Sequence, residues 1–316
     1  MVFFSILYTS LTEKTTVLFT SSNSSFTECV RNHNLQRISS NNYYYNAFQS
    51  HENNQNMKRF VCAEEGEYLF TNCDWTELTI DYNGSAISLT NSESTLIVEK
   101  CSFTDCIVEA DCGGAIYVYG INKATITESS FVHCNILSSD NNENGGGGIY
   151  LELVSDEVLI RLCSFLDNSV PHDGAGVDMW SCSCTTFNTK TFQDCRFIMC
   201  KGKAENSFPY NQPFEEGGGI LAWENEYNVG ISNTLFCECS NYRGGALEIS
   251  VPLEVLSPFI LFCLFHGNDA TYGKDVCFGN CDTIPFSHSF TTSSGKYAVS
   301  KEEHPNEYYP HWFPQG

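Results

Sequence analysis

Apolar and polar residues alternate in short stretches along much of the chain, and each stretch follows a glycine-rich block. The apolar positions of these stretches are Ile116/Val118, Ile149/Leu151/Leu153, Val177/Met179, Ile220/Ala222 and Leu247/Ile249. A spacing of two residues places alternate side chains on opposite faces of a β-strand. No long stretch has helical spacing without being interrupted by glycine. The pattern therefore predicts an all-β chain built from short strands.

A second pattern, Phe followed three residues later by Cys or Asn, recurs eight times at intervals of about 30 residues. The copies are Phe26/Cys29, Phe70/Cys73, Phe103/Cys106, Phe131/Cys134, Phe165/Asn168, Phe197/Cys200, Phe236/Cys239 and Phe265/Asn268. Most copies are followed by a glycine block that ends in an aliphatic residue, as in Gly113-Gly114-Ala115-Ile116. Self-similarity at a fixed period indicates a stacked array of units rather than one closed globule.

Other positions are fixed relative to the Phe of each repeat. Five residues before it, six consecutive copies carry a large apolar residue: Val98, Ile126, Ile160, Phe192, Ile231 and Ile260. Two residues before it, the same copies carry a small one: Cys101, Ser129, Cys163, Cys195, Thr234 and Cys263. Each unit is too small to bury its own apolar side chains, so equivalent residues must stack on one another in successive units.

We therefore predict a single-stranded parallel β-helix of about eight coils, with glycine and Asn/Cys at its corners. Its structural ladders are expected at Phe103, Phe131, Phe165, Phe197, Phe236 and Phe265, and at Cys106, Cys134, Asn168, Cys200, Cys239 and Asn268. The main alternative, a leucine-rich repeat, also has an Asn/Cys ladder. It would need Leu-x-x-Leu-x-Leu spacing and gives no reason for paired glycines.

The alternating Gly-Gly-Ala-Ile and Phe-x-x-Asn motifs resemble the polymorphic outer-membrane protein repeat, within the pectin-lyase-like group of right-handed parallel β-helices. The resemblance covers residues 70–280 and implies a right-handed coil and a surface-displayed, adhesin-like passenger domain. One departure is that six of the eight corner positions hold Cys rather than Asn. In this respect the chain looks most similar to Cys-rich surface proteins of protists.

The chain is acidic, with 16 Lys and Arg against 38 Asp and Glu in 316 residues and a formal net charge of −22. This charge opposes binding to nucleic acid and to anionic lipid. No segment reaches the roughly 18 apolar residues that a membrane span needs. Residues Val2 to Leu7 are mostly apolar but lack a basic n-region. We expect a cell-surface or secreted protein, with a cytoplasmic location as the alternative.

Seventeen cysteines raise the question of disulfide bonds. Equivalent positions on adjacent coils lie about one strand spacing apart, which is within the Cα separation that a disulfide tolerates. Cys106 with Cys134, Cys163 with Cys195, and Cys200 with Cys239 are therefore candidate rungs. The alternative is that these residues are small, buried, free thiols that serve only in packing. The sequence leaves both open.

The spacing between repeats indicates where binding takes place. The distance from a glycine block to the next Phe is nearly constant, whereas the distance from Cys/Asn to the next glycine block varies, which predicts insertions along one edge. The long insertions are residues 30–59 with Tyr43, Tyr44 and Tyr45, residues 135–145 with Asp140 and Glu143, and residues 201–216 with Phe208, Tyr210 and Phe214. These residues are expected to bind a surface protein or a glycan, or else to cap the coil.

No catalytic, metal-binding or cofactor site is predicted. A polysaccharide hydrolase of this fold would need clustered carboxylates. Asp105 and Asp167 share one position of the repeat, but His133 holds it in the coil between them, and Asp173 and Asp178 border one glycine corner. Cys182-x-Cys184 and Cys237-x-Cys239 do not define four metal ligands. A carbohydrate-active enzyme and an intracellular scaffold remain the alternatives to a non-enzymatic interaction domain.

Three regions are expected along the chain: an N-terminal segment at 1–14, β-helix repeats at 15–281, and a C-terminal cap or linker at 282–316. Two tripeptides match the N-glycosylation sequon, Asn23-Ser24-Ser25 and Asn83-Gly84-Ser85. Two such matches are compatible with chance.

Overall fold

The computed structural model describes most of the repeat region and three short stretches beyond it. The described residues are 57–63, 65–91, 93–109, 111–137, 145–171, 173–180, 182, 190–202, 217–222, 229–249, 260–270 and 273–277, with the backbone alone of 15–20, 43–48, 223, 250, 259, 278–279, 286–287, 290–291 and 298–300. Within these residues all regular structure is β-strand, in three parallel sheets.

The strands of each sheet come from successive coils. Sheet A has ten strands: β1 (Thr15–Thr20), β2 (Tyr43–Phe48), β4 (Glu67–Thr71), β7 (Thr95–Glu99), β10 (Lys123–Thr127), β14 (Glu157–Arg161), β18 (Lys190–Gln193), β22 (Val229–Ser232), β25 (Phe259–Leu261) and β28 (Phe286–Ser287). Sheet B has nine strands: β3 (Phe60–Cys62), β6 (Ile87–Thr90), β9 (Ile116–Tyr119), β13 (Ile149–Glu152), β17 (Val177–Trp180), β21 (Ile220–Trp223), β24 (Leu247–Ser250), β27 (Val276–Gly279) and β30 (Ala298–Ser300). Sheet C has eleven strands: β5 (Asp74–Ile80), β8 (Ser102–Val108), β11 (Ser130–Val132), β12 (Asn135–Ile136), β15 (Ser164–Leu166), β16 (Ser169–Val170), β19 (Arg196–Ile198), β20 (Lys201–Gly202), β23 (Leu235–Cys237), β26 (Leu264–His266) and β29 (Phe290–Thr291).

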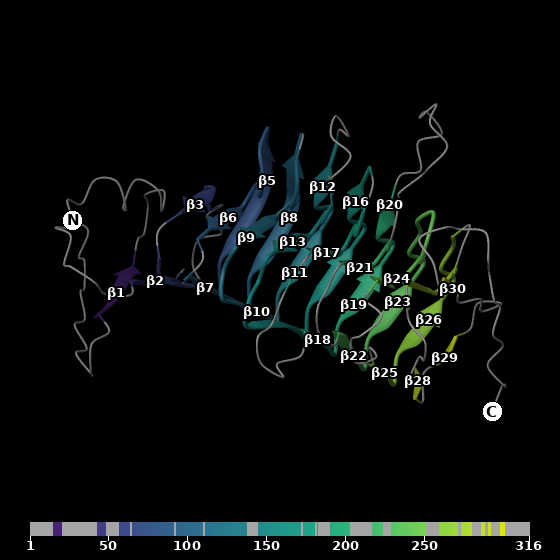
Figure 1. Ribbon diagram of the computed structural model, residues 1–316. Helices are drawn as coiled ribbons and strands as arrows, with labels where there is room; N and C mark the ends of the chain where they lie inside the picture. The colour runs from purple at the N-terminus through teal and green to yellow at the C-terminus, as the bar shows by residue number, and fades with distance from the viewer. Residues whose placement is uncertain are drawn as a thin grey trace.

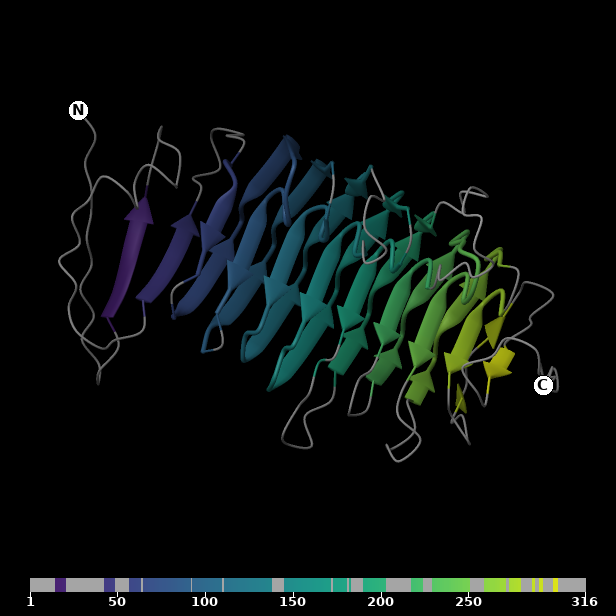
Figure 2. The ribbon, with the colours of Figure 1, turned by 45° about the horizontal axis from the view of Figure 1, so that its top comes forward.

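Within each coil the chain passes from sheet A to sheet C and then to sheet B. After β7, β8 and β9, for example, β10, β11 and β13 pair with them in parallel, one coil further along. Six consecutive turns run from Thr95 to Gly279, and β4–β6 and β28–β30 extend the sheets at the two ends (Figures 1 and 2). The prediction of an all-β parallel solenoid is confirmed, although the structure has about six complete turns where about eight coils were expected.

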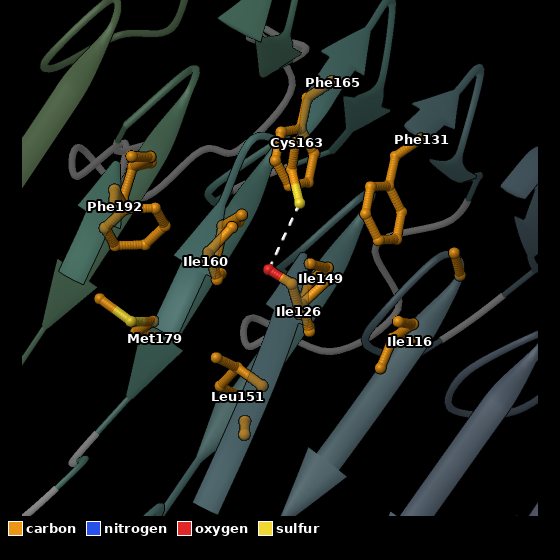
Figure 3. Packing of buried hydrophobic residues seen from close by; sticks show 14 of the residues in the cluster. Ile116, Ile126, Phe131, Ile149, Leu151, Ile160, Cys163, Phe165, Met179 and Phe192 are labelled. Carbon is orange, nitrogen blue, oxygen red and sulfur yellow. Dashed lines mark hydrogen bonds between the residues drawn. The ribbon is translucent and has the colours of Figure 1, made fainter. Parts of the chain in front are cut away.

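The core is a set of side-chain ladders that run along the coil axis. The rings of Phe103, Phe131, Phe165, Phe197, Phe236 and Phe265 are stacked, with centroids 4.6–5.1 Å apart and planes within 9° of parallel. Figure 3 shows how Phe131 and Phe165 of sheet C, Ile126 and Ile160 of sheet A, and Ile116 and Ile149 of sheet B meet in the interior. Burying a side chain of this kind stabilises the fold by about 1.5–3 kcal/mol, so the stacked repeats hold the coils together.

The structure explains why both Cys and Asn are found at the corner position of the repeat. The amide Nδ2 of Asn168 donates to the carbonyl oxygen of Phe131 at 3.3 Å, and the thiol of Cys200 donates to that of Phe165 at 3.7 Å. Both side chains are therefore donors to the Phe carbonyl of the preceding coil. Asn168 makes one further bond, because its Oδ1 accepts from the backbone N–H of Cys134 at 2.8 Å. Either residue satisfies a buried carbonyl that would otherwise be costly.

The assignment of Phe70 and Cys73 to the Phe-x-x-Cys ladder is wrong, because Phe70 lies in sheet A and not in sheet C. Phe70 lies in sheet A and pairs with Val98, whereas Trp75 pairs with Phe103 and stacks on it at 4.8 Å. Phe70 packs against the edge of the Trp75 ring instead. Both residues are large, apolar and fully buried, so the motif alone could not tell the two ladders apart.

Two boundaries also differ from the sequence predictions. Tyr43, Tyr44 and Tyr45 were expected in a long insertion at 30–59, but they lie in β2, which pairs with β1 and β4. The strand-forming tendency of consecutive tyrosines accounts for this. At the other end, β28–β30 pair with β25–β27, so the strands continue beyond residue 281.

Replacing Gly114 with alanine should destabilise the fold by about 3 kcal/mol, at the upper end of overpacking costs. A Cβ at this position would clash with the carbonyl oxygen of Gly147, a backbone atom of the next coil. Gly120 is the matched control, because it has φ +66° but nothing within 4 Å of its Cβ position, so Gly120→Ala should cost only about 1–2 kcal/mol. Urea unfolding of both variants tests this, and a larger loss for Gly120→Ala would contradict it.

Candidate functional site

The binding residues predicted from loop length lie mainly beyond what can be described. Asp140, Glu143, Phe208, Tyr210 and Phe214 fall outside the described residues. The connections that contain them, 137–148 and 203–219, join sheet C to sheet B. The connections from sheet B back to sheet A also vary, from 120–122 to 181–189. The spacing of the repeats predicted variable connections along one edge of the β-helix, whereas connections of variable length flank sheet B on both sides.

The outer face of sheet B differs chemically from the outer faces of the other two sheets. Its first outward row, in strand register, is Tyr117, Tyr150, Asp178, Leu221, Glu248 and Cys277. Its second row includes Tyr119, Glu152 and Trp180, which also face one another on neighbouring strands. The outward rows of sheet C hold mainly small residues and leucine, such as Ser130 and Leu166, and those of sheet A also hold charged residues, such as Glu99, Lys123 and Glu157. Among the described residues, outward-facing aromatic side chains are thus concentrated on sheet B.

Five residues on β9, β13 and β17 form what we call the sheet B patch: Tyr117, Tyr119, Tyr150, Glu152 and Trp180. The rings of Tyr117 and Tyr150 are stacked at 5.5 Å with an interplanar angle of 4°. The Tyr150 hydroxyl donates to Glu152 Oε2 at 3.1 Å. Tyr150 is 5% exposed, whereas Tyr119 is 41% exposed and Glu152 and Trp180 are partly exposed. The buried row therefore supports a second row that remains open to contact.

The environment of the patch keeps the phenols of Tyr117 and Tyr150 and the neighbouring Cys112 thiol protonated. Burial raises the pKa of Tyr150 well above its usual value, and the nearby carboxylate of Asp178 adds to the shift. Burial likewise raises the pKa of Tyr117 and of the Cys112 thiol. At neutral pH the patch therefore offers hydroxyl donors from the tyrosines beside the acceptor oxygens of Glu152.

Comparison with known protein families assigns the fold. A family model described as a right handed beta helix region matches residues 21–236, about two thirds of the chain. The chain belongs to the right-handed β-helix family. No curated protein and no solved structure matched it. This fold occurs in both enzymes and adhesins, so membership alone does not decide the function.

At the C-terminal end of the same β-helix face, the charges are paired within the protein. Arg243 Nη2 lies 3.0 Å from Oε1 of Glu248, a residue that is fully buried. Arg243 also lies 4.0 Å from the sulfur of Cys277. A buried ion pair of this kind adds little net stability, but removing one partner is costly. The Glu248 carboxylate at this end of the sheet is therefore paired within the protein, whereas the patch over β9, β13 and β17 is partly exposed.

Asp105, His133 and Asp167, which share one position of the repeat, form a second polar group at a corner of sheet C. His133 Nδ1 lies 3.3 Å from Asp105 Oδ1, and His133 Nε2 lies 3.4 Å from Asp167 Oδ2. All three side chains are about half exposed, and ion pairs at such positions contribute little. In the described part of the β-helix, no group of His, Cys, Asp and Glu is arranged to hold a metal ion, and no helix is long and apolar enough to cross a membrane.

The sequence contains a signal for the sheet B patch that the repeat motifs do not include. Each patch residue comes one or three positions after the first aliphatic residue of a strand that follows a glycine block. Such positions point outward by simple alternation. In this repeat family, comparing the outward positions of the three sheets, coil by coil, identifies the face whose residues are not needed for the fold.

Proposed function

We propose that this β-helix is a non-enzymatic interaction domain, displayed on a cell surface or secreted, that binds a protein or a glycan across the outer face of sheet B. The observation that carries the proposal is the row of Tyr119, Glu152 and Trp180, which stays partly exposed above the stacked Tyr117 and Tyr150. Aromatic side chains supply large contact area at low entropic cost, and they are enriched at the centres of interfaces.

The chemistry of the patch supports a partner with both apolar and polar groups. The tyrosine and tryptophan rings offer apolar surface, while Glu152 and the phenol hydroxyls offer hydrogen bonds. Sugars and protein side chains both present this combination. The net charge of −22 also keeps an elongated chain soluble, as a displayed or secreted domain requires.

Replacing Trp180 or Tyr119 with alanine should weaken binding at least tenfold, because each substitution removes a partly exposed ring from the centre of the patch. The measurement is a screen of the full chain against arrayed glycans and surface proteins, followed by the Kd of each variant for the ligand found. Leu166→Ala is the matched control, since Leu166 lies on the outer face of sheet C in the same coil as Trp180. Equal loss in Leu166→Ala and Trp180→Ala would contradict the proposal.

A polysaccharide-cleaving enzyme is the second candidate, and one observation favours it. Glu152 and the fully buried Asp178 occupy diagonal positions on neighbouring parallel strands of the same face. A strand spacing of about 4.8 Å and a rise of about 3.3 Å per residue place their Cβ atoms roughly 8 Å apart. Carboxyl groups separated by roughly 6.5–9.5 Å serve as acid and base in inverting glycosidases. New reducing ends released from any glycan that binds, and lost in Glu152→Gln, would replace the non-enzymatic proposal with this one.

A further inference from the structure

The corner at residues 81–85 contains the glycosylation sequon Asn83-Gly84-Ser85. Its Asn and its Ser both stand where the other coils have different residues. Gly84 is equivalent to Gly113 and Gly146 of the next two coils, since each donates its N–H to the residue before the next corner glycine. The position before this glycine holds Asn83 here but Cys112 and Gly145 in the next two coils. The position after it holds Ser85, Gly114, Gly147, Ala175, Gly218 and Gly245 in successive coils. The β-helix therefore requires neither Asn83 nor Ser85 for its corner.

The hydrogen bonds of Asn83 use its carbonyl groups and leave its amide nitrogen aside. Its Oδ1 accepts from the backbone N–H of Cys112 at 2.8 Å, and its backbone carbonyl accepts from the Arg59 guanidinium. Among the described residues, no hydrogen bond is donated by Asn83 Nδ2. The neighbouring Tyr82 is 63% exposed, and Asp81 is exposed as well. Asn83 is itself partly exposed, so the amide nitrogen lies on the outer side of a corner whose following residues, Gly84 and Ser85, are buried.

The other corner asparagines show the opposite arrangement. Asn168 and Asn268 are buried, and their Nδ2 atoms donate to the carbonyl oxygens of Phe131 and Phe236 at 3.3 Å. A substituent on either nitrogen would break these bonds and would have no room. Asn83 is different, because a substituent on its nitrogen would extend from an exposed corner and cost no described hydrogen bond.

From these observations we infer that Asn83 carries an N-linked glycan. In the transfer reaction a bond forms between Asn83 Nδ2 and C1 of a sugar, the lipid-linked diphosphate that carried the sugar leaves, and the amide nitrogen loses one proton. The product is a secondary amide that keeps Oδ1, so the bond from Cys112 is retained. Asn-x-Ser is the acceptor sequence for this modification in secreted proteins.

The burial of Ser85 determines whether the glycan is transferred before or after this corner folds. Ser85 is fully buried, and its hydroxyl donates to the carbonyl of Gly114 in the next coil. The transferring enzyme reads this hydroxyl as part of the sequon, so transfer takes place before the corner folds. Glycosylation therefore occurs during export, in the compartment where the chain folds.

The glycan would border the sheet B patch at its N-terminal side. A Cβ at Gly84 would lie 3.0 Å from the Cβ of Tyr117, so the corner abuts the first residue of the patch. This inference goes beyond the proposed function and does not depend on it. It concerns the route of the protein through the cell, whereas the proposed function concerns what the patch binds.

The test is peptide mapping of the full-length chain, purified from the cells that make it, by mass spectrometry. Enzymatic release of N-glycans in heavy-oxygen water should convert Asn83 to a labelled Asp. Asn83→Asp is the matched variant, because it keeps an acceptor for the Cys112 N–H but cannot take a glycan. It should lose the whole glycan mass at this site with unchanged stability, and Ser85→Thr should retain the glycan.

Two results would overturn the inference. One is an unmodified peptide containing Asn83 in the protein from its own cells, wherever the protein is located. The other is a glycan mass that stays unchanged in Asn83→Asp and disappears only in Asn23→Gln, which would assign the glycan to the other sequon. Neither result affects binding by the sheet B patch, which the Trp180 and Tyr119 variants test separately.

Discussion

Replacing Phe165 with alanine should lower the free energy of unfolding by about 3–5 kcal/mol, the usual cost of removing a fully buried phenylalanine. The ring is stacked between Phe131 at 4.8 Å and Phe197 at 4.6 Å, and it is completely buried. Its removal leaves a cavity between two rings that cannot close in, because each is held by the strand register of its own coil. Urea denaturation gives the free energy directly from the midpoint and slope.

Leu166→Ala is the control for Phe165→Ala, since the two residues are adjacent in β15 but point to opposite faces. Leu166 is partly exposed on the outer face of sheet C, so its truncation should cost within about 0.5–1 kcal/mol. If the two variants were equally destabilised, the ring stack would not be what holds the coils together. A change in slope without a change in midpoint would instead indicate that one end of the solenoid unfolds separately.

The fold could be predicted from the sequence because a solenoid repeats its constraints. Each coil needs an inward Phe, an inward aliphatic residue and a close-packed glycine, so the same pattern returns at each turn and chance matches are averaged out. The prediction failed where a coil departs from this pattern. At Phe70 and Trp75 two aromatic residues five positions apart both satisfy the interior, and only the pairing of Trp75 with Phe103 shows which one belongs to sheet C.

The candidate site was harder to predict for the same physical reason. Residues such as Tyr119, Glu152 and Trp180 have no role in the repeat, so no periodic signal marks them. Loop length directed attention to insertions, whereas the described patch lies on regular strands between them. Its residues come together only because the coils stack in register, which places side chains some 30 residues apart on neighbouring strands. A motif search along the chain cannot detect that relation.

The Cys237 thiol should react with an alkylating reagent at least tenfold faster than Cys195 and Cys263 in the native protein. Burial raises the pKa of Cys195 to about 12 and that of Cys263 to about 11. Each unit lowers the reactive thiolate about tenfold, so at pH 8 the thiolate fraction of Cys263 is on the order of one in a thousand. Cys237 lies on the outer face of β23, where it is partly exposed. Partial burial and the neighbouring Glu238 raise its pKa as well, so its higher reactivity comes mainly from the access of the reagent to the sulfur. Peptide mapping after timed labelling measures the rates.

Labelling after denaturation without a reductant distinguishes the two roles considered for the cysteine ladders, which are disulfide bonds between coils and buried free thiols. The described cysteines are free thiols, and in two of the expected rungs, Cys106 with Cys134 and Cys200 with Cys239, each thiol donates to a backbone carbonyl oxygen of the preceding coil. Disulfide exchange requires a thiolate, which burial suppresses, so these thiols should survive even in an oxidising compartment and label fully once the chain unfolds. A disulfide between Cys200 and Cys239 in the native protein would contradict this. It would mean that oxidation occurs before the coils close over the thiols, and that the ladder acts as a covalent staple rather than as packing.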